Sequence, residues 1–290
     1  MKILVTGGAG FIGSNIVDEL IEKKHKVVVV DNLATGNIKN VNKKAKFYKV
    51  SVCDKKKIDD IFKKEKIDVV IHLAAQLDVR KSVADPCFDA DVNIKGSLNI
   101  LEACKNTKVK KIIFSSSGGT IYGECGAKAP DEKAFENPLS PYGVAKLSVE
   151  HYIKAYSELY GLKYTILRYA NVYGPRQDVN GEAGVVAIFI GKMSANKEIF
   201  IFGDGKQLRD YVYVKDVVSA NIKSLTKGNN EIINIGTNKT TSVTKLAQEL
   251  YKFVHYEKKP VFKPKRNGEL FTCVHPTSCS MYATLGGVDP

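Results

Sequence analysis

Two side chains that could move a proton, Tyr142 and Lys146, stand four residues apart in a segment with helical patterning. On a helix, this spacing places a phenol and an ammonium on the same face. Three consecutive hydroxyl groups, on Ser115, Ser116 and Ser117, end an apolar segment that predicts a strand. In a parallel sheet they would lie at the carboxyl edge, where such sheets bind ligands. A hydroxyl, a phenol and an ammonium can form a proton-transfer set, in which the ammonium lowers the pKa of the phenol.

A glycine-rich loop near the N-terminus supports this catalytic interpretation. Residues 6–13 read Thr-Gly-Gly-Ala-Gly-Phe-Ile-Gly, between a predicted strand and a predicted helix. In such a loop Gly7 permits the tight turn, Gly10 lets the backbone approach a pyrophosphate, and Gly13 lets the helix pack against the strand. The helix N-terminus then offers free N–H groups to phosphates. Without this loop, an exposed pair on a helix surface would be the simpler interpretation of Tyr142 and Lys146.

Asp31 ends the strand that follows, close to the roughly 20 residues after Gly10 at which a ribose-binding acid is expected. Its carboxylate would accept hydrogen bonds from the ribose hydroxyls and repel a 2′-phosphate. We therefore expect NAD as the cofactor rather than NADP.

The elements that must position these residues alternate along the first half of the chain. Apolar runs predict strands at residues 2–6, 26–31, 46–52, 69–73, 110–115 and 164–168, and amphipathic stretches predict helices at 14–23, 55–64, 91–106 and 142–160. Strands of nearly continuous apolar sequence that alternate with helices are typical of a parallel sheet covered on both faces. The sequence therefore predicts an α/β fold with a Rossmann-type doubly wound parallel sheet.

The pattern changes after residue 168. Residues 171–182 predict a loop because they are rich in Gly, Pro, Asn and Asp, while 184–195 predict a helix and 200–205 a strand with a turn. Residues 210–214 and 232–236, with a helix opened by Asp216 between them, are expected to return to the main sheet. We expect an NAD-binding domain of residues 1–168 plus 210–237 and a smaller, discontinuous C-terminal substrate lobe of residues 169–209 plus 238–290.

Composition excludes several classes of protein. The chain has 290 residues, of which 44% are hydrophobic and 26% charged, as is ordinary for a globular protein with a buried core. No apolar run approaches the roughly 18–20 residues of a membrane span, and no segment is typical of a signal peptide. The six cysteines and five histidines show no metal-ligand spacing, so we expect no metal site. The cysteines are expected to be free thiols of a cytoplasmic protein.

The formal net charge of +13 raises the question of a polyanionic partner. The lysines are spread over predicted helix surfaces, however, and neither interleaved aromatic residues nor a nucleic-acid motif accompanies them. We therefore favour solvated helix faces and expect no nucleic-acid partner. A basic surface would still favour an anionic small substrate.

Several longer segments together resemble the extended short-chain dehydrogenase/reductase family, over residues 2 to about 269. In the cofactor half they are the glycine loop, residues 31–33, residues 72–76, the serine run with Tyr122 and Gly123, and residues 142–146. Residues 167–176 and 203–211 are more specific, because they resemble the branch of the family that acts on sugar nucleotides.

The resemblance implies roles for individual residues. The implied catalytic residues are Tyr142, Lys146 and Ser117, with Ser116 as the alternative hydroxyl. The implied cofactor-binding residues are Gly7, Gly10, Phe11, Ile12, Gly13, Asp31, Asn32, Leu33, Thr35, Gly36, Ser51, Val52, Leu73, Ala74, Ala75, Gln76, Asn93, Tyr142 and Lys146. The implied substrate-binding residues are Ser117, Tyr142, Asn171, Val185, Arg209 and Arg266. A turn cap at Asn171 and an ion pair of Arg209 with Asp210 are the simpler alternatives.

The resemblance also implies an isomerase with tightly bound NAD. It would interconvert UDP-glucose and UDP-galactose through a 4-keto intermediate and would form a homodimer through helices 91–106 and 142–160. The N-acetylated UDP-sugars are further candidate substrates, because Cys273 falls near the family position that limits the group at sugar C2. A UDP-uronate 4-epimerase, a nucleotide-sugar reductase and a non-catalytic NAD-binding protein are the alternatives. A 4,6-dehydratase is disfavoured, because Gly119 and Thr120 replace the Asp-Glu pair expected before Tyr122.

Overall fold

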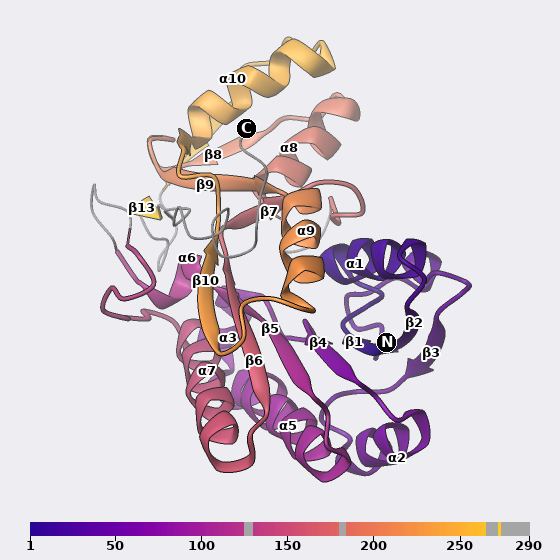
Figure 1. Ribbon diagram of the computed structural model, residues 1–290. Coiled ribbons are helices and arrows are strands. Elements are labelled where there is room, and N and C mark those ends of the chain that lie inside the picture. The colour runs from indigo at the N-terminus through magenta and orange to yellow at the C-terminus, as the bar shows by residue number, and fades with distance from the viewer. Residues whose placement is uncertain (125–129, 180–183, 265–271, 274–290) are drawn as a thin grey trace.

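The computed structural model describes residues 1–124, 130–179, 184–264 and 272–273. Within these ranges, seven parallel strands form the main sheet. They are β1 (Lys2–Thr6), β2 (Lys26–Asp31), β3 (Lys46–Lys49), β4 (Val69–His72), β5 (Lys111–Ser117), β6 (Lys163–Tyr169) and β10 (Glu231–Ile235). Their order is β10-β6-β5-β4-β1-β2-β3, so the direction of winding reverses between β1 and β4 (Figure 1). Ligands of doubly wound sheets bind outside the carboxyl ends of the strands at this reversal.

Helices cover both faces of this sheet, as the apolar strands require. One face carries α1 (Phe11–Glu22) and α9 (Val214–Ser224), and the other carries α2 (Lys55–Glu65), α5 (Gly96–Thr107) and α7 (Pro141–Tyr160) (Figure 1). The four valines of β2 alternate between the two cores, because successive strand residues point to opposite faces. The predicted fold class is confirmed.

The region between β4 and α5 is less regular than the sequence predicts. It contains α3 (Val79–Ala84) and α4 (Pro86–Ala90), and the expected helix at 91–106 starts as a π-helical turn, η2 (Asp91–Lys95), before α5 begins. Such turns are rare and occur frequently at functional sites. Asn93, one of the predicted cofactor residues, lies in this turn. Two further short helices lie elsewhere in the chain, η1 (Ile38–Asn40) between β2 and β3 and α6 (Gly118–Ile121) directly after β5.

A second body stands above the carboxyl edge of the main sheet (Figure 1). Its strands are β7 (Asn171–Tyr173), β8 (Phe200–Phe202), β9 (Leu208–Tyr213), β11 (Thr240–Ser242), β12 (Val261–Lys263) and β13 (Thr272–Cys273), and its helices are α8 (Val185–Ser194) and α10 (Val243–Val254). A separate core of Phe189, Met193, Ile199, Ile201, Ala247 and Tyr256 lies between α8, α10 and β8. The predicted helix at 184–195 and the strand at 200–205 are confirmed, although the strand ends at Phe202.

The prediction that residues 210–214 return to the main sheet is wrong. Residues 210–213 belong to β9, which pairs with β7, β11 and β13 in a separate sheet, and Val214 opens α9. In β9 buried residues alternate with partly exposed ones, as in a strand that buries only one face, whereas the main-sheet strands are buried on both. Residues 171–173, expected in a loop, form β7 against β9. The division into two domains stays a prediction, although its expected boundary between residues 209 and 210 falls inside β9.

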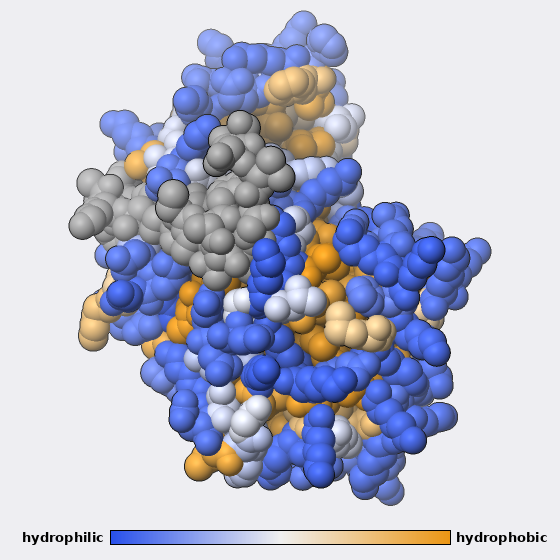
Figure 2. All heavy atoms as spheres, viewed as in Figure 1, coloured by the Kyte–Doolittle hydropathy of each residue, from blue (hydrophilic) through white to orange (hydrophobic). Residues whose placement is uncertain are grey.

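Many of the lysines lie on the surface of the helices. Several pair with acids one turn away on the same helix, as Lys55 does with Asp59 at 2.6 Å and Lys252 with Glu249 at 2.8 Å. Hydrophilic residues cover most of the face in Figure 2. Within the part of the chain that the structure describes, no helix is long and apolar enough to cross a membrane. A cytoplasmic location stays a prediction from the sequence.

Candidate active site

The glycine loop follows β1 and lies at the reversal of the sheet. Gly7 has a φ of +69°, and a Cβ there would lie 2.9 Å from the backbone nitrogen of Ala74, which follows β4. A Cβ at Gly13 would overlap the carbonyl oxygen of Gly7, so α1 packs against the loop only because this residue is glycine. No side chain caps the N-terminus of α1 at Gly10, which leaves its N–H groups for an anion. The loop therefore fits a dinucleotide diphosphate, as predicted.

Asp31 joins the two loops that would surround an adenosine ribose. Its Oδ2 accepts a hydrogen bond from the Ala9 N–H at 3.0 Å, and its Oδ1 accepts one from the Leu33 N–H at 2.8 Å. A Cβ at Gly36 would lie 2.9 Å from Asp31 Oδ1, so this loop also passes close to the carboxylate. The position at the carboxyl end of β2 fits the predicted ribose-binding acid.

The remaining predicted adenosine contacts differ in exposure. Asn32 and Thr35 are exposed beside Asp31. Ser51 is partly exposed, but Val52 is 5% exposed and packs in the core, so only its backbone could face a cofactor.

A series of buried hydrogen bonds holds the backbone after β4 in place. Thr6 Oγ1 accepts hydrogen bonds from the N–H groups of Leu73 and Ala74, both at 3.1 Å, and lies 2.6 Å from His72 Nδ1. Ser97 Oγ donates to the carbonyl oxygen of Asn93, so it accepts from His72 Nε2 at 2.9 Å. His72 Nδ1 is then the acceptor for the Thr6 hydroxyl. Burial and the positive charge of Lys146 lower the pKa of His72 to about 3, so the imidazole is neutral.

Gln76 and Asn93, both predicted cofactor residues, are bonded to each other. The Gln76 N–H donates to Asn93 Oδ1, and Asn93 Nδ2 donates to the Gln76 carbonyl oxygen, each at 2.9 Å. Both side-chain amides also donate to Asp89 Oδ1, at 2.8 and 2.9 Å. Their polar groups therefore shape the wall of the site. Asp89, Thr6 and Ser97 were not predicted as site residues, and only the position of His72 at a strand end offered a signal.

The structure brings the predicted Tyr-Lys pair to the end of β5. Ser140 caps α7 by accepting a hydrogen bond from the Gly143 N–H at 3.2 Å, and Pro141 opens its first turn. Lys146 Nζ donates to the Ser115 carbonyl oxygen at 2.9 Å and lies 5.8 Å from the centroid of the Tyr142 ring. Burial lowers the pKa of Lys146 to about 8, although neighbouring carboxylates oppose this shift.

In the protein without a cofactor, burial opposes ionisation of the Tyr142 phenol. Burial, together with the negative charge of Asp89, raises the pKa of the Tyr142 phenol above its ordinary value. The lowered pKa expected for Tyr142 beside Lys146 and a cationic nicotinamide stays a prediction, because in the chain by itself desolvation disfavours the phenolate. A phenolate base would require further positive charge beside it.

The two candidate serines lie in different environments. Ser116 is 3% exposed, and its hydroxyl donates to Glu150 Oε1 at 2.6 Å. Ser117 is partly exposed at the end of β5. This geometry favours Ser117 as the hydroxyl that faces a substrate.

Beneath the site, Arg168 ties α7 and the segment before it to the sheet. The guanidinium is fully buried and donates to both oxygens of Glu150, at 3.0 and 2.6 Å. It also donates to Glu136 Oε1 at 2.8 Å and to the Tyr122 hydroxyl at 2.7 Å. This cluster fixes the helix that carries Tyr142 and Lys146.

The predicted substrate residues lie in the second body or outside the description. Asn171 opens β7 opposite Tyr211 of β9, and Arg209 lies two residues before Tyr211 on the same strand. Val185 is the first residue of α8. Arg266 lies outside the described residues, and of Cys273 only the backbone is described.

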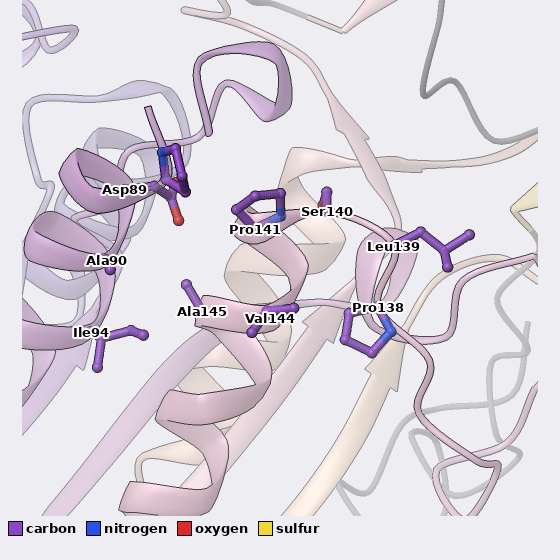
Figure 3. Close-up of a pocket in the computed structure, with 10 residues that line it drawn as sticks. Asp89, Ala90, Ile94, Pro138, Leu139, Ser140, Pro141, Val144 and Ala145 are labelled. Carbon is purple, nitrogen blue, oxygen red and sulfur yellow. The ribbon is translucent and has the colours of Figure 1, made fainter. Parts of the chain in front are cut away.

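A hollow of about 510 Å³ lies beside this site, between α4 and the start of α7 (Figure 3). Most of its lining is apolar, from residues such as Ile94, Pro138 and Val144. It is lined by neither Tyr142 nor Lys146, so we do not interpret it as the reaction site. Asp89 borders it from α4 and lies across from the first turn of α7.

Comparisons with known proteins agree with this geometry. Residues 3–236 match the NAD dependent epimerase/dehydratase family. A putative UDP-glucose 4-epimerase from Methanocaldococcus jannaschii is 50% identical over 269 residues, which cover 93% of this chain and 88% of that protein.

The solved structures that are similar over nearly the whole chain include two UDP-glucose 4-epimerases. The UDP-glucose 4-epimerase of Thermotoga maritima, solved with UDP-glucose, is 50% identical with a TM-score of 0.96, covering 99% of this chain and 93% of that one. The UDP-glucose 4-epimerase of Thermus thermophilus, solved in complex with NAD, is 41% identical with a TM-score of 0.93, covering 98% of this chain and 92% of that one.

Proposed function

The chain belongs to the NAD-dependent epimerase/dehydratase family, and on this premise we propose that it is a UDP-glucose 4-epimerase. It would interconvert UDP-glucose and UDP-galactose through a 4-keto intermediate. The observation that carries the proposal is the bond from Lys146 Nζ to the Ser115 carbonyl oxygen. It places the Tyr-Lys pair at the carboxyl edge of the sheet, two strands from the glycine loop. The similarity to epimerases solved with UDP-glucose and with NAD supports the choice of reaction.

The residues present fit an NAD cofactor. The uncapped N-terminus of α1 and the close packing at Gly7 and Gly13 would hold its diphosphate, and Asp31 would hold the adenosine ribose. When bound, NAD would accept a hydride from C4 of the sugar and return it to the opposite face of the ketone.

The catalytic side chains would handle the proton and the orientation. Tyr142 would take the proton of the C4 hydroxyl as it becomes a ketone and give it back when C4 is inverted. Ser117 would hydrogen-bond the reacting oxygen, and Lys146 would hold a ribose hydroxyl. Asn171, Arg209, Val185 and Arg266 are the proposed contacts of the UDP moiety. Because no net oxidation occurs, NAD should stay bound from one turnover to the next.

Related reactions are less well supported by the site. Curated relatives at 35–37% identity include dTDP-D-glucose 4,6-dehydratases. Elimination of water requires an acid beside the sugar, and α6, which follows β5, carries Gly119 and Thr120 where that branch has carboxylates. A UDP-uronate 4-epimerase is the main alternative, because the UDP-glucuronic acid 4-epimerase of Bacillus cereus is similar at 33% identity and a TM-score of 0.89.

A homodimer through α5 and α7 is part of the proposal. Val144, Tyr152 and Leu159 of α7 are 48%, 41% and 70% exposed, so this helix presents apolar side chains that a second copy could cover. A monomeric mass in solution at micromolar concentration would contradict this assembly.

The direct test is to incubate the purified chain with UDP-galactose, without added cofactor, and to separate the products by chromatography. We expect UDP-glucose to form. Tyr142→Phe, which removes only the phenolic hydroxyl, is expected to lower kcat by about 10²–10⁴-fold, the usual contribution of a positioned acid–base group.

No conversion of UDP-galactose, even with NAD supplied, would contradict the proposed substrate. Activity on UDP-glucuronate or UDP-N-acetylglucosamine would then identify a different sugar. Stoichiometric consumption of NAD(P)H would instead indicate a reductase.

A further inference from the structure

Asp89 is a buried carboxylate that neither the sequence analysis nor the proposed mechanism uses. It lies on α4 and is 1% exposed. Its Oδ1 accepts hydrogen bonds from the side-chain amides of Gln76 and Asn93. Its Oδ2 is also buried and accepts no hydrogen bond from any residue that the structure describes. A buried carboxylate oxygen without a donor is costly, so its presence calls for a physical reason.

The surroundings of Asp89 connect it to the proposed proton-transfer pair. Helix α4 packs against α7, and Asp89 lies across from the first turn of α7 in Figure 3. Asp89 acts electrostatically on both Tyr142 and Lys146. None of the ion pairs between described residues includes Asp89, so no cation among those residues pairs with it at close range.

Among the described residues, the other charged or titratable groups near Lys146 already have partners or are neutral. Glu150, one turn along α7, is held by two bonds from Arg168 of β6. His72 of β4 is neutral, with both ring nitrogens bonded. Tyr142 is on the same face of α7, and Phe114 of β5 presents its ring to the ammonium at 4.8 Å. Asp89 is therefore the one uncompensated negative charge among these described neighbours.

We propose that Asp89 is a positioning residue of the reaction, which holds Gln76 and Asn93 through one oxygen and, with its other oxygen unpaired, brings a buried negative charge against the start of α7, the helix that carries Tyr142 and Lys146. This inference rests on the proposed function and deepens it. Burial works against the ammonium, and the nearby carboxylate offsets part of that cost. The same carboxylate disfavours the Tyr142 phenolate, so the pair stays protonated until the positive charge of the oxidised cofactor lies beside it.

The test removes the charge of Asp89 and keeps its shape. In Asp89→Asn the amide oxygen can still accept the bonds from Gln76 and Asn93, while the negative charge is lost. We expect the pKa of Lys146 to fall by roughly one unit, the size of shift that a nearby buried charge produces. This pKa is followed by the ¹³C resonance of the lysine ε-carbon during a pH titration, and Lys146→Met assigns the signal.

Asp91→Asn is the matched control, because the Asp91 side chain is 64% exposed two residues further along and is paired with Lys95 at 3.4 Å. It is expected to leave the pKa of Lys146 unchanged. In the turnover assay, Asp89→Asn should also shift both limbs of the kcat/KM pH profile to lower pH, because both Tyr142 and Lys146 lose a proton more easily.

An unchanged Lys146 pKa in a folded Asp89→Asn variant would overturn the proposal and leave Asp89 a purely structural role. If that variant fails to fold, Asp89→Ser, which keeps an acceptor in a smaller volume, is titrated in its place. The titration needs no substrate, so it separates this inference from the proposed function: a wild-type chain that titrates as expected but converts no UDP-sugar contradicts only the latter.

Discussion

Two buried carboxylates, Asp89 of α4 and Glu150 of α7, act electrostatically on Lys146, and they differ in their hydrogen-bond partners. Glu150 accepts hydrogen bonds from Ser116 and, through both of its oxygens, from Arg168. Asp89 receives two bonds from neutral amides on one oxygen and none from the described residues on the other. A compensated carboxylate fixes the position of α7, whereas an uncompensated one can still change the electrostatic potential at its neighbours. The comparison suggests that holding a catalytic group and tuning it are assigned to separate residues.

Breaking the ion pair between Arg168 and Glu150 is expected to have the largest effect on stability. Arg168→Met removes the cation from Glu150 and Glu136, which leaves a fully buried carboxylate without a charge partner. We expect a loss of about 3–5 kcal/mol in the free energy of unfolding, measured by urea denaturation.

The double variant Arg168→Met/Glu150→Gln is the control, since it removes the unpaired charge as well, and it should be more stable than Arg168→Met. Asp89→Asn should cost much less than Arg168→Met, because it strands no cation. Equal losses of stability from Asp89→Asn and Arg168→Met would contradict the different roles assigned to Asp89 and Glu150.

The buried ammonium of Lys146 is expected to lower the free energy of unfolding of the protein at neutral pH. Burial lowers the pKa of Lys146 from the ordinary value near 10.5 to about 8. At neutral pH the charged lysine is therefore less stable in the folded protein than in the unfolded chain. Lys146→Met should therefore raise the free energy of unfolding at pH 7, by about 1–3 kcal/mol, while it abolishes most of the turnover.

The pH dependence gives the sign of this effect. Between pH 8 and 10.5 the unfolded chain binds more protons at this lysine than the folded one, so wild-type stability rises with pH. The advantage of Lys146→Met should shrink over that range. Lys111, whose pKa is also lowered to about 8 by burial, is present in both proteins and cancels in the difference. An advantage that stays constant with pH would show that Lys146 is not buried as a charged group.

Local sequence patterns predicted those parts of this arrangement that depend on neighbours in the chain. The valine run of β2, the glycine loop with Asp31 and the four-residue spacing of Tyr142 and Lys146 all carry their signal within a short segment. Their geometry follows from strand alternation, loop sterics and helix periodicity. The structure agrees with the prediction at each of them.

The parts that were missed depend on contacts between distant segments. Thr6 and His72 are joined across 66 residues, and Asp89 meets Gln76 across 13. An isolated aspartate predicts a solvated position, and Asp89 is buried because α4 packs against α7 and because Gln76 and Asn93 bond to it. The misplacement of β9 has a similar cause, because its partners β7, β11 and β13 are too short to be predicted as strands.

The smallest expected effect separates the two serines at the end of β5. Adjacent strand residues point to opposite faces, and Ser116 points toward Glu150. Ser116→Ala removes one donor from a carboxylate that Arg168 still bonds, so we expect a loss of about 0.5–1.5 kcal/mol in stability with kcat nearly unchanged. Ser117→Ala should do the reverse, because its partly exposed hydroxyl supports no described buried group and faces the substrate in the proposed reaction. Urea denaturation and the epimerase assay on both variants measure the two effects. A loss of kcat in Ser116→Ala alone would identify Ser116 as the catalytic serine. The residues bonded to Glu150 would then also take part in the chemistry.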